Sequence, residues 1–488
     1  MYTGVKESIH NCLPTFSGSG RKKVAVIETP SSIRPVARHF FVRPNASKFR
    51  VGHDIVPNAI TPCYDAAVLA SYVASLGYDT RILDANALPL SLSEICGWIR
   101  KGQPDFVIIH AADNTLEEDM ALAAYTEGIG ISCIYWDEIL APYRVELIRR
   151  NYPFLRRILG EEPEGHIRDF LKPGEPVREL TCLSGGEGID LNSLPVVDFS
   201  MLPMDRYVKW GKRFWQTANM RGCAWGKCTY CLQARESRQR AFRLRSIDNI
   251  RQELDGAIKT HGVEHILFFS YEVNPSQKAF DELTRLMAEY PKVTWECYLR
   301  ADNFSEETIR NAAKSGCTDV CIGVENVNSK VLESTRKNIS SDNIRKLFKL
   351  AKKYGIYTTA MVMIGSPDET VESLEETERF VKELRPWSVV PAYLRVFPGT
   401  PVEKTIQSIS DHDYLKCLEE SPGAQTGTKP TYVPRALSSD VLEGYYHRLR
   451  KIGKGRLSWQ LRFFEGFIRE KRFLEEVLVR SIKRVGRR

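Results

Sequence analysis

The stretch Arg221-Gly222-Cys223-Ala224-Trp225-Gly226-Lys227-Cys228-Thr229-Tyr230-Cys231 places three thiols within nine residues. A loop of this length can direct three sulfur atoms at one centre, which suits ligation of an iron–sulfur cluster or zinc. The next cysteine is Cys297 and the next histidine is His261, and neither stands in a paired motif. The stretch therefore offers three protein ligands, and one coordination position is expected to stay open for a substrate, as in catalytic sites.

Downstream of this stretch, apolar runs alternate with helical patterns as far as about Thr400. The strand candidates are Ile266–Phe269, Val293–Cys297, Val320–Val324, Thr358–Ile364 and Val389–Leu394. The helical patterns lie at Ile247–Thr260, Gln277–Tyr290, Glu306–Ser315, Ile344–Tyr354 and Val371–Leu384. Repeated β–α alternation with short loops predicts a (β/α) barrel or part of one, with functional groups where strands end.

Upstream of the cysteines, a second alternation of strands and helices predicts an α/β domain with a doubly wound parallel sheet. Buried strands are expected at Val24–Ile27, Thr80–Leu83, Phe106–Ile109 and Ile131–Tyr135. Helices are expected at Tyr64–Leu76, with Gly77 as the C-terminal stop, and at Ile95–Arg100. Ligands of such sheets bind beyond the carboxyl ends of the strands.

The 488 residues are too many for one ordinary core, and we expect four parts. These are a first α/β domain at 21–171, a linker at 172–213, the barrel at 214–405 and a helical C-terminal region at 406–488. From Leu461 onward, apolar residues recur near helical spacing with basic residues between them. This pattern is compatible with a helix that packs on the barrel, and also with contact to a membrane surface or an anionic ligand.

The composition is that of a globular protein, with 43% hydrophobic and 27% charged residues. We find no uncharged apolar run of about 18 residues and no signal-peptide pattern in Met1–Gly20, so a cytoplasmic location is expected. Twelve cysteines, most of them isolated in apolar settings, do not predict a disulfide framework. The net charge of +8 is mild and partly local to residues 471–488, so no nucleic-acid partner is expected.

The cysteine stretch and the segments after it together resemble the radical S-adenosylmethionine (SAM) superfamily, from about Thr217 to Pro401, which implies a partial (β/α)₆ barrel. An aromatic residue, Tyr230, precedes the last cysteine. The other matching segments, in the family's order, are Phe268-Phe269-Ser270-Tyr271-Glu272, Trp295-Glu296-Cys297-Tyr298-Leu299-Arg300, Gly316-Cys317, Gly323-Val324-Glu325-Asn326, Ile364-Gly365-Ser366-Pro367-Asp368-Glu369-Thr370 and Phe397-Pro398-Gly399-Thr400-Pro401. Each match is weak alone, and their order and spacing carry the resemblance.

This resemblance implies a [4Fe–4S] cluster on Cys223, Cys228 and Cys231, whose fourth iron binds SAM and whose electron cleaves SAM to a 5′-deoxyadenosyl radical. By analogy, Ser270 and Glu272 would face the methionine amino group and Arg300 would pair with its carboxylate. Glu325 would lie near the ribose, and Gly365 would let the backbone approach the adenine. The sequence departs from the family in having four residues, instead of three, between Cys223 and Cys228. Gly226 is expected to let this longer loop fold.

The first α/β domain resembles the cobalamin-binding class of the same superfamily, over about Lys22 to Val208. The matching segments are Gly77-Tyr78-Asp79-Thr80-Arg81-Ile82-Leu83-Asp84-Ala85, Pro104-Asp105-Phe106-Val107-Ile108-Ile109, Gly160-Glu161-Glu162-Pro163-Glu164, and a linker from Leu194-Pro195 to Tyr207. Where the class has glycines for the nucleotide tail of cobalamin, this chain has Ile134-Tyr135-Trp136-Asp137-Glu138. It also has no Asp-x-His-x-x-Gly motif, and His53 and His110 are the nearest candidates for a cobalt ligand.

These resemblances favour a cobalamin-dependent radical enzyme that methylates an unactivated carbon of a small molecule. The main alternative is a cobalamin-independent radical SAM enzyme that catalyses cyclisation, oxidation or rearrangement. A methylthiotransferase with a second cluster on Cys12, Cys63 and Cys96, and a zinc-stabilised binding protein, are weaker alternatives. The expected partners are a small-molecule substrate, lipid-like or anionic, and a reductant such as flavodoxin or ferredoxin. Peripheral membrane contact through the C-terminal region is a further expectation.

Overall fold

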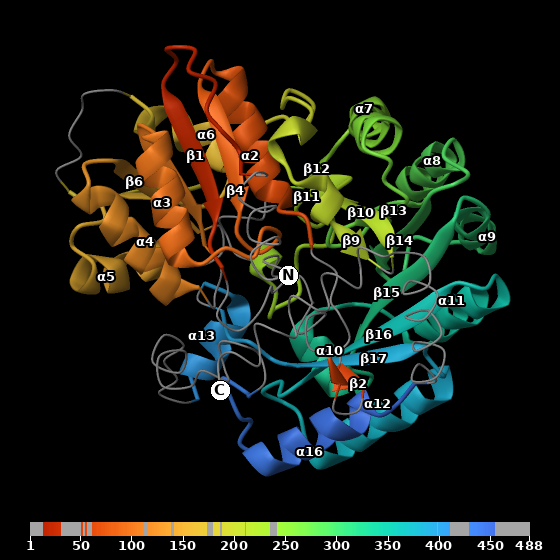
Figure 1. Cartoon of the computed structure of the whole chain (residues 1–488). Helices are drawn as coiled ribbons and strands as arrows, with labels where there is room; N and C mark the ends of the chain where they lie inside the picture. The colour runs from red at the N-terminus through yellow and green to blue at the C-terminus, as the bar shows by residue number, and fades with distance from the viewer. Residues whose placement is uncertain are drawn as a thin grey trace. The chain divides into compact units, whose positions relative to one another are not determined.

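The computed structural model describes residues 13–30, 50–51, 54–55, 61–111, 115–137, 141–172, 179–185, 188–209, 211–234, 242–397, 399–409 and 429–453. The chain divides into two compact units. The first contains Met1–Phe40, Ile60–Tyr207 and Asp248–His261, and the second contains Phe41–Ala59, Val208–Ile247 and Gly262–Arg488. Each unit is built on one large sheet (Figure 1).

The sheet of the first unit has six parallel strands in the order β4-β1-β5-β6-β7-β8. The strands are β1 (Lys23–Glu28), β4 (Asp79–Asp84), β5 (Phe106–His110), β6 (Ser132–Trp136), β7 (Arg157–Leu159) and β8 (Thr181–Leu183). Consecutive residues Val24, Ala25, Val26 and Ile27 are all fully buried, so both faces of the sheet are covered. The predicted doubly wound α/β sheet is therefore confirmed.

The helices of this unit are α2 (Tyr64–Ser75), α3 (Leu92–Gly102), α4 (Leu116–Gly128), α5 (Ala141–Asn151) and α6 (Pro163–Phe170). Helix α2 ends where the sequence indicates, because Gly77 has a φ of 96°, in the left-handed region that favours glycine. Helix α3 begins at a capping box, in which Ser91 and Glu94 each accept a backbone N–H of the other. The unit also contains α7 (Ile247–Asp255), the π-helix η5 (Gly256–Thr260) and the short 3₁₀ helices η2 (Phe199–Met201) and η3 (Met204–Arg206).

The second unit contains a seven-stranded sheet in the order β17-β16-β15-β14-β13-β10-β9. Its strands are β9 (Val208–Lys209), β10 (Lys212–Thr217), β13 (His265–Phe268), β14 (Thr294–Leu299), β15 (Cys317–Glu325), β16 (Tyr357–Ile364) and β17 (Ser388–Tyr393). Six of them run parallel, and only β9 pairs antiparallel, with β10. Figure 1 shows this sheet curving, with helices along one side. The predicted partial (β/α)₆ barrel is confirmed.

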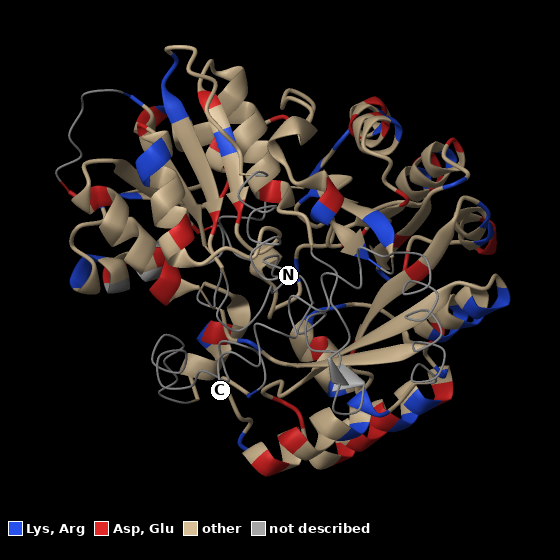
Figure 2. Cartoon of the chain, viewed as in Figure 1, with Lys and Arg blue, Asp and Glu red and all other residues tan. Residues whose placement is uncertain are grey.

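The helices of the second unit are α8 (Gln277–Ala288), α9 (Glu306–Lys314), α10 (Ser329–Thr335), α11 (Ser341–Lys353), α12 (Val371–Leu384), α13 (Pro401–Gln407) and α16 (Ser439–Arg450). The hydroxyls of Ser276, Ser305, Ser340 and Thr370 cap α8, α9, α11 and α12, and each accepts a backbone N–H three residues on. Figure 2 shows charged residues concentrated on these helices, whereas most of β16 and β17 carries none. Helices α9, α11 and α16 contact β15, β16 and β17 respectively, as expected of helices that bury an apolar side against a sheet.

Two small antiparallel pairs complete the described strands. They are β2 (Arg50–Val51) with β3 (Asp54–Ile55), and β11 (Met220–Arg221) with β12 (Arg243–Leu244). The range 172–213, expected to be a linker, includes β8, which extends the first sheet by pairing with β7. The helical pattern from Leu461, as well as His53 and Cys12, lie outside the described residues.

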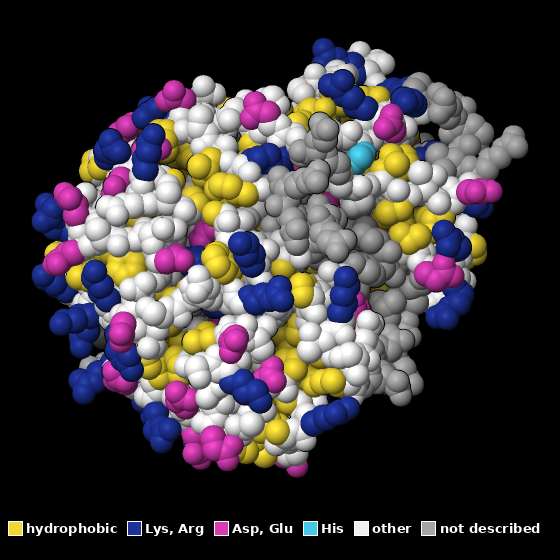
Figure 3. All heavy atoms as spheres, turned by 180° about the vertical axis from the view of Figure 1, so that it is seen from behind, with side chains coloured by type: hydrophobic (Ala, Val, Ile, Leu, Met, Phe, Trp, Pro, Cys, Tyr) yellow, Lys and Arg dark blue, Asp and Glu magenta, His cyan; other side chains and the backbone are white. Residues whose placement is uncertain are grey.

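In the described ranges, no helix is both long and apolar enough to cross a membrane. On the face drawn in Figure 3, basic and acidic side chains are interspersed with polar and hydrophobic ones.

Candidate active site

The six non-cysteine residues expected at the site are Tyr230, Ser270, Glu272, Arg300, Glu325 and Gly365. Five of them follow or end neighbouring strands of the second sheet. Ser270 and Glu272 follow β13, Arg300 follows β14, Glu325 ends β15 and Gly365 follows β16. These strands are adjacent and parallel, so the five residues share the carboxyl edge of the sheet, where barrel enzymes gather functional groups.

The three cysteines lie on a loop between β11 and the 3₁₀ helix η4 (Leu232–Ala234). The backbone N–H of Gly226 approaches the Cys223 sulfur at 3.5 Å, and the N–H of Gln233 approaches the Cys231 sulfur at the same distance. Gly226 has a φ of 57°, and a Cβ there would lie 3.4 Å from the Cys223 carbonyl oxygen. Glycine thus suits this point of the longer loop, and backbone donors already face two of the sulfurs.

The loop contacts the sheet edge through Glu272, which follows β13. Glu272 Oε1 accepts the backbone N–H of Ala224 at 3.0 Å and lies 3.4 Å from the Cys223 sulfur. Burial raises the pKa of the Glu272 carboxyl. Burial, and then the Glu272 charge, raise the pKa of Cys223 to about 12. Metal binding at this position must therefore displace a proton.

The donor set fits an iron–sulfur cluster by its chemistry, with three thiols on one short loop and backbone N–H groups facing sulfur. In the part of the chain that the structure describes, no three side chains of His, Cys, Asp or Glu already form a metal-binding group.

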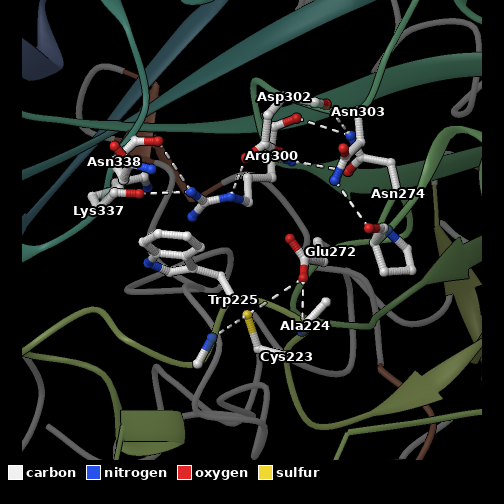
Figure 4. A network of polar contacts seen from close by, with 12 residues as sticks. Cys223, Ala224, Trp225, Glu272, Asn274, Arg300, Asp302, Asn303, Lys337 and Asn338 are labelled. Carbon is white, nitrogen blue, oxygen red and sulfur yellow. Dashed lines mark hydrogen bonds and ion pairs between the residues drawn. The ribbon is translucent and has the colours of Figure 1, made fainter.

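Trp225, between Cys223 and Cys228, links the loop to Arg300. The indole Nε1 donates to the carbonyl oxygen of Arg336 at 2.8 Å. The Arg300 guanidinium lies over the indole ring, 4.8 Å from its centre (Figure 4). Arg300 also donates to Asp302 at 2.5 Å and to the Lys337 carbonyl oxygen at 2.6 Å. Pairing of Arg300 with the carboxylate of SAM stays a prediction, and its guanidinium already has protein acceptors.

Glu325 forms an ion pair with Lys337, in which Nζ and Oε1 are 2.7 Å apart. The two side chains are only 15% and 9% exposed, so the pair is largely desolvated. Glu325 has a φ of 58° at the end of β15. A Cβ on Gly323 would lie 2.5 Å from the Lys337 nitrogen and 2.8 Å from Glu325 Oε1, so a side chain there would crowd the pair.

A buried carboxyl group, that of Glu369, holds the Gly365 loop through hydrogen bonds. Glu369 accepts the backbone N–H groups of Gly365 and Ser366 and the side-chain N–H of Asn326, the last at 2.6 Å. Burial outweighs these hydrogen bonds and raises the pKa of Glu369 from 4.5 to about 7. Gly365 has a φ of 94°, which favours glycine at this position.

The raised pKa of Glu369 predicts a pH-dependent stability. The folded state holds this proton more tightly than the unfolded chain, so the stabilisation is fully present below about pH 4.5 and is lost as pH rises through about 7. We expect the free energy of unfolding of the wild type, measured against that of Glu369→Gln, to fall by about 2–3 kcal/mol from pH 5 to pH 8. Urea titrations of both proteins at the two pH values measure this difference in the free energy of unfolding. A difference that does not change with pH would contradict the expectation.

Ser270 and Tyr230 have partners around the loop. Ser270 donates to Asn219 Oδ1 at 2.5 Å and accepts the Asn219 backbone N–H at 3.0 Å, just before the cysteine stretch. Burial raises the pKa of the Tyr230 hydroxyl, as it raises the pKa of the nearby Cys228 thiol. Contact of Ser270 with the amino group of SAM stays a prediction.

The carboxyl edge of the first sheet is lined with buried polar residues. Glu28 ends β1 and His110 ends β5, and His110 Nδ1 lies 2.5 Å from Glu28 Oε1. The His110 ring stacks on Trp136 at the end of β6, with ring centres 4.0 Å apart. Trp136 is 1% exposed, and its indole nitrogen has no acceptor among the described residues.

Two of the three cysteines of the methylthiotransferase alternative, Cys63 and Cys96, lie in the part of the chain that the structure describes. The Cys63 sulfur lies 3.5 Å from the Tyr207 hydroxyl, which donates to Asp84 at 3.1 Å. Cys96 lies within α3 and is half-buried. Burial raises the pKa of both thiols.

Sequence reasoning missed three residues of the second unit. Trp225 stands inside the quoted stretch, but its contacts come from residues about 75 and 110 positions later. Glu369 belongs to a segment quoted for its resemblance, without a role of its own. Lys337 follows α10 in no motif, and no signal in the sequence pairs it with Glu325.

Comparison with known proteins agrees with this geometry. Residues 220–381 match the Radical SAM superfamily. An uncharacterized methyltransferase, PH0819, from Pyrococcus horikoshii is 26% identical over 341 residues, which are 66% of this chain and 73% of that protein.

Two solved structures share the fold across both sheets. The methyltransferase TsrM from Kitasatospora setae, with tryptophan and a SAM analogue bound, has a TM-score of 0.65 at 14% identity, over 95% of this chain and 100% of TsrM. The cobalamin-dependent enzyme OxsB, with aqua-cobalamin bound, has a TM-score of 0.63 at 14% identity. That match covers 83% of this chain and 65% of OxsB. The match to the radical SAM superfamily is thus confined to residues 220–381, and the chain shares the fold of these two solved structures.

Proposed function

We propose that this chain is a cobalamin-dependent radical SAM enzyme that methylates an unactivated carbon of a small molecule. The observation that carries the proposal is the placement of the cysteine loop. Cys223 and Ala224 contact Glu272 at the carboxyl edge where Arg300, Glu325 and Gly365 also follow their strands. Cluster ligands and SAM-binding candidates thus lie on one edge of the half-barrel.

We assign the cluster to Cys223, Cys228 and Cys231. With SAM, the bound cluster supplies a 5′-deoxyadenosyl radical, which abstracts hydrogen from carbon. The chain's own residues would orient SAM: Ser270 and Glu272 would face the amino group, Glu325 would lie near the ribose, and Gly365 would let the backbone approach the adenine. Tyr230 stays a proposed neighbour of the cluster, because it directly precedes the proposed ligand Cys231.

We place cobalamin at the carboxyl edge of the first sheet, the position at which such sheets bind ligands. The Trp136 indole N–H is buried there without an acceptor among the described residues, and the peripheral amides of a corrinoid offer carbonyl acceptors. OxsB, which shares this fold, was solved with aqua-cobalamin bound. The residues therefore fit the corrinoid ring, and His110 would lie beside it, stacked on Trp136.

A second candidate is a cobalamin-independent radical enzyme that cyclises, oxidises or rearranges its substrate. The side chains at the end of β6 favour it. Tyr135 is fully buried and Trp136 nearly so, in place of the glycines that leave space for a nucleotide tail. Both candidates require a small-molecule substrate and a one-electron reductant such as flavodoxin or ferredoxin, and both fit a cytoplasmic enzyme.

Anaerobic purification from cobalamin-supplied cells tests the assignment. We expect about four irons and about one corrinoid per chain after free corrinoid is removed, with release of 5′-deoxyadenosine from SAM on reduction. The variant Trp136→Phe tests the indole N–H, because it keeps an aromatic ring but removes the donor. We expect it to retain several-fold less corrinoid than the wild type while holding the same amount of iron. A protein that holds iron and cleaves SAM but contains no corrinoid would exclude the first candidate and support the second. Absence of iron would overturn both.

A further inference from the structure

The segment between Cys223 and Cys228 is held from outside the loop through one side chain, Trp225. Its indole N–H bonds to the Arg336 carbonyl oxygen at 2.8 Å. The Arg300 guanidinium covers the Trp225 ring at 4.8 Å (Figure 4). Arg300 follows β14 and Arg336 follows α10. Two separate elements of the half-barrel therefore fix one residue of the loop.

Arg300 is itself fixed in place. Asn274 accepts the Arg300 backbone N–H at 3.0 Å and donates to its carbonyl oxygen at 2.9 Å. The guanidinium bonds to Asp302 and to the Lys337 carbonyl oxygen, and the side chain is only 9% exposed. Because hydrogen bonds hold both the backbone and the side chain of Arg300, its guanidinium is preorganised over Trp225.

This cation also lies close to the cysteine loop. The Arg300 guanidinium covers Trp225, which stands between the two proposed cluster ligands Cys223 and Cys228. A fixed positive charge beside a cluster stabilises the added negative charge of its reduced state, most strongly in a partly buried site.

We propose that Trp225 and Arg300 form a clamp that positions the four-residue segment between the first two cysteines and holds the bound cluster at a higher reduction potential. The inference rests on the proposed cluster site. Arg300 is a positioning residue in this role. The cation–π contact and the indole hydrogen bond are each strong enough to hold a short loop.

Two measurements on the anaerobic, cluster-loaded protein without SAM test the clamp. The first is the rate of iron loss to a ferrous chelator. We expect Trp225→Leu to lose iron about tenfold faster than the wild type, and Trp225→Phe, which keeps the ring but not the N–H, to fall between them. If Trp225→Leu does not fold, Trp225→Phe alone decides, and it must still lose iron faster than the wild type.

The second measurement is the midpoint potential of the cluster, from a redox titration followed by electron paramagnetic resonance. We expect Arg300→Met to make the midpoint potential of the cluster more negative by ~59 mV. For one electron, this shift corresponds to a tenfold change in the reduced-to-oxidised ratio. Arg300→Lys keeps the charge but not the planar fork. It should hold the wild-type potential more closely while losing iron faster.

The matched control is Arg345→Lys, in the same unit, where a guanidinium lies 4.7 Å from the centre of the Phe380 ring on other elements. It should change neither measurement. Wild-type iron loss in Trp225→Leu or Trp225→Phe, or an unchanged potential in Arg300→Met, would overturn the clamp. A wild type with no cluster would instead overturn the proposed function.

Discussion

Replacing Cys231 with alanine is expected to reduce the iron content from about four per chain to almost none. Two remaining thiols cannot hold a four-iron cluster, because each of three irons needs its own protein ligand. Cleavage of SAM should fall to the level of a protein-free control. The Cys231 backbone N–H bonds to the Cys228 carbonyl oxygen at 2.9 Å, and its sulfur is approached by the Gln233 N–H at 3.5 Å. The substitution keeps the backbone bond, so loss of the thiol should not unfold the chain.

The control for this variant is Cys321→Ala. Cys321 lies on β15 of the same unit, is half-buried and packs beside Phe214, Leu267 and Tyr298. This variant removes a thiol from the sheet and should keep full iron content. Equal iron loss in the two variants would mean that thiol number, and not the loop, determines metal content. Retention of four irons by Cys231→Ala would contradict the assigned ligand set.

Lys337→Met is expected to lower the free energy of unfolding by about 3–5 kcal/mol, since it leaves the Glu325 carboxylate largely buried without its partner. The Nζ–Oε1 distance of 2.7 Å and the low exposure of both side chains make this pair different from the exposed pairs of the surface. Urea unfolding of the anaerobic protein gives the number. SAM binding should weaken as well if Glu325 lies near the ribose, as proposed.

The double variant Glu325→Gln with Lys337→Met shows whether the stability lost in Lys337→Met comes from the unpaired carboxylate or from lost packing of the lysine stem. It removes both charges and should recover most of the lost stability, because no uncompensated carboxylate remains. Lys353→Met breaks an exposed pair with Glu306 and should change stability little. If the double variant were as unstable as Lys337→Met, the lysine stem and not the ion pair would be the stabilising part.

Much of the fold could be predicted from local patterns. The strand expected at Thr358–Ile364 is β16 (Tyr357–Ile364), and the helix expected at Val371–Leu384 is α12 with the same bounds. Both succeed because a fully buried parallel strand is a continuous apolar run and an amphipathic helix repeats its apolar residues. The expected helix Ile247–Thr260 is instead α7 followed by the π-helix η5, since a change in hydrogen-bond register leaves no mark on apolar spacing.

By itself, the sequence determined the two parallel sheets, the three thiols on one loop, and which residues follow which strand, because these depend on residue type, period and order along the chain. The tertiary structure alone decided which side chains meet. It placed Glu272 against Cys223, Lys337 against Glu325, and Arg300 over Trp225. These contacts join residues 12 to 75 positions apart, through the strand register and the turns at the sheet edge. Local propensities do not determine these contacts, because the contacts form only when the strands of the sheet have paired.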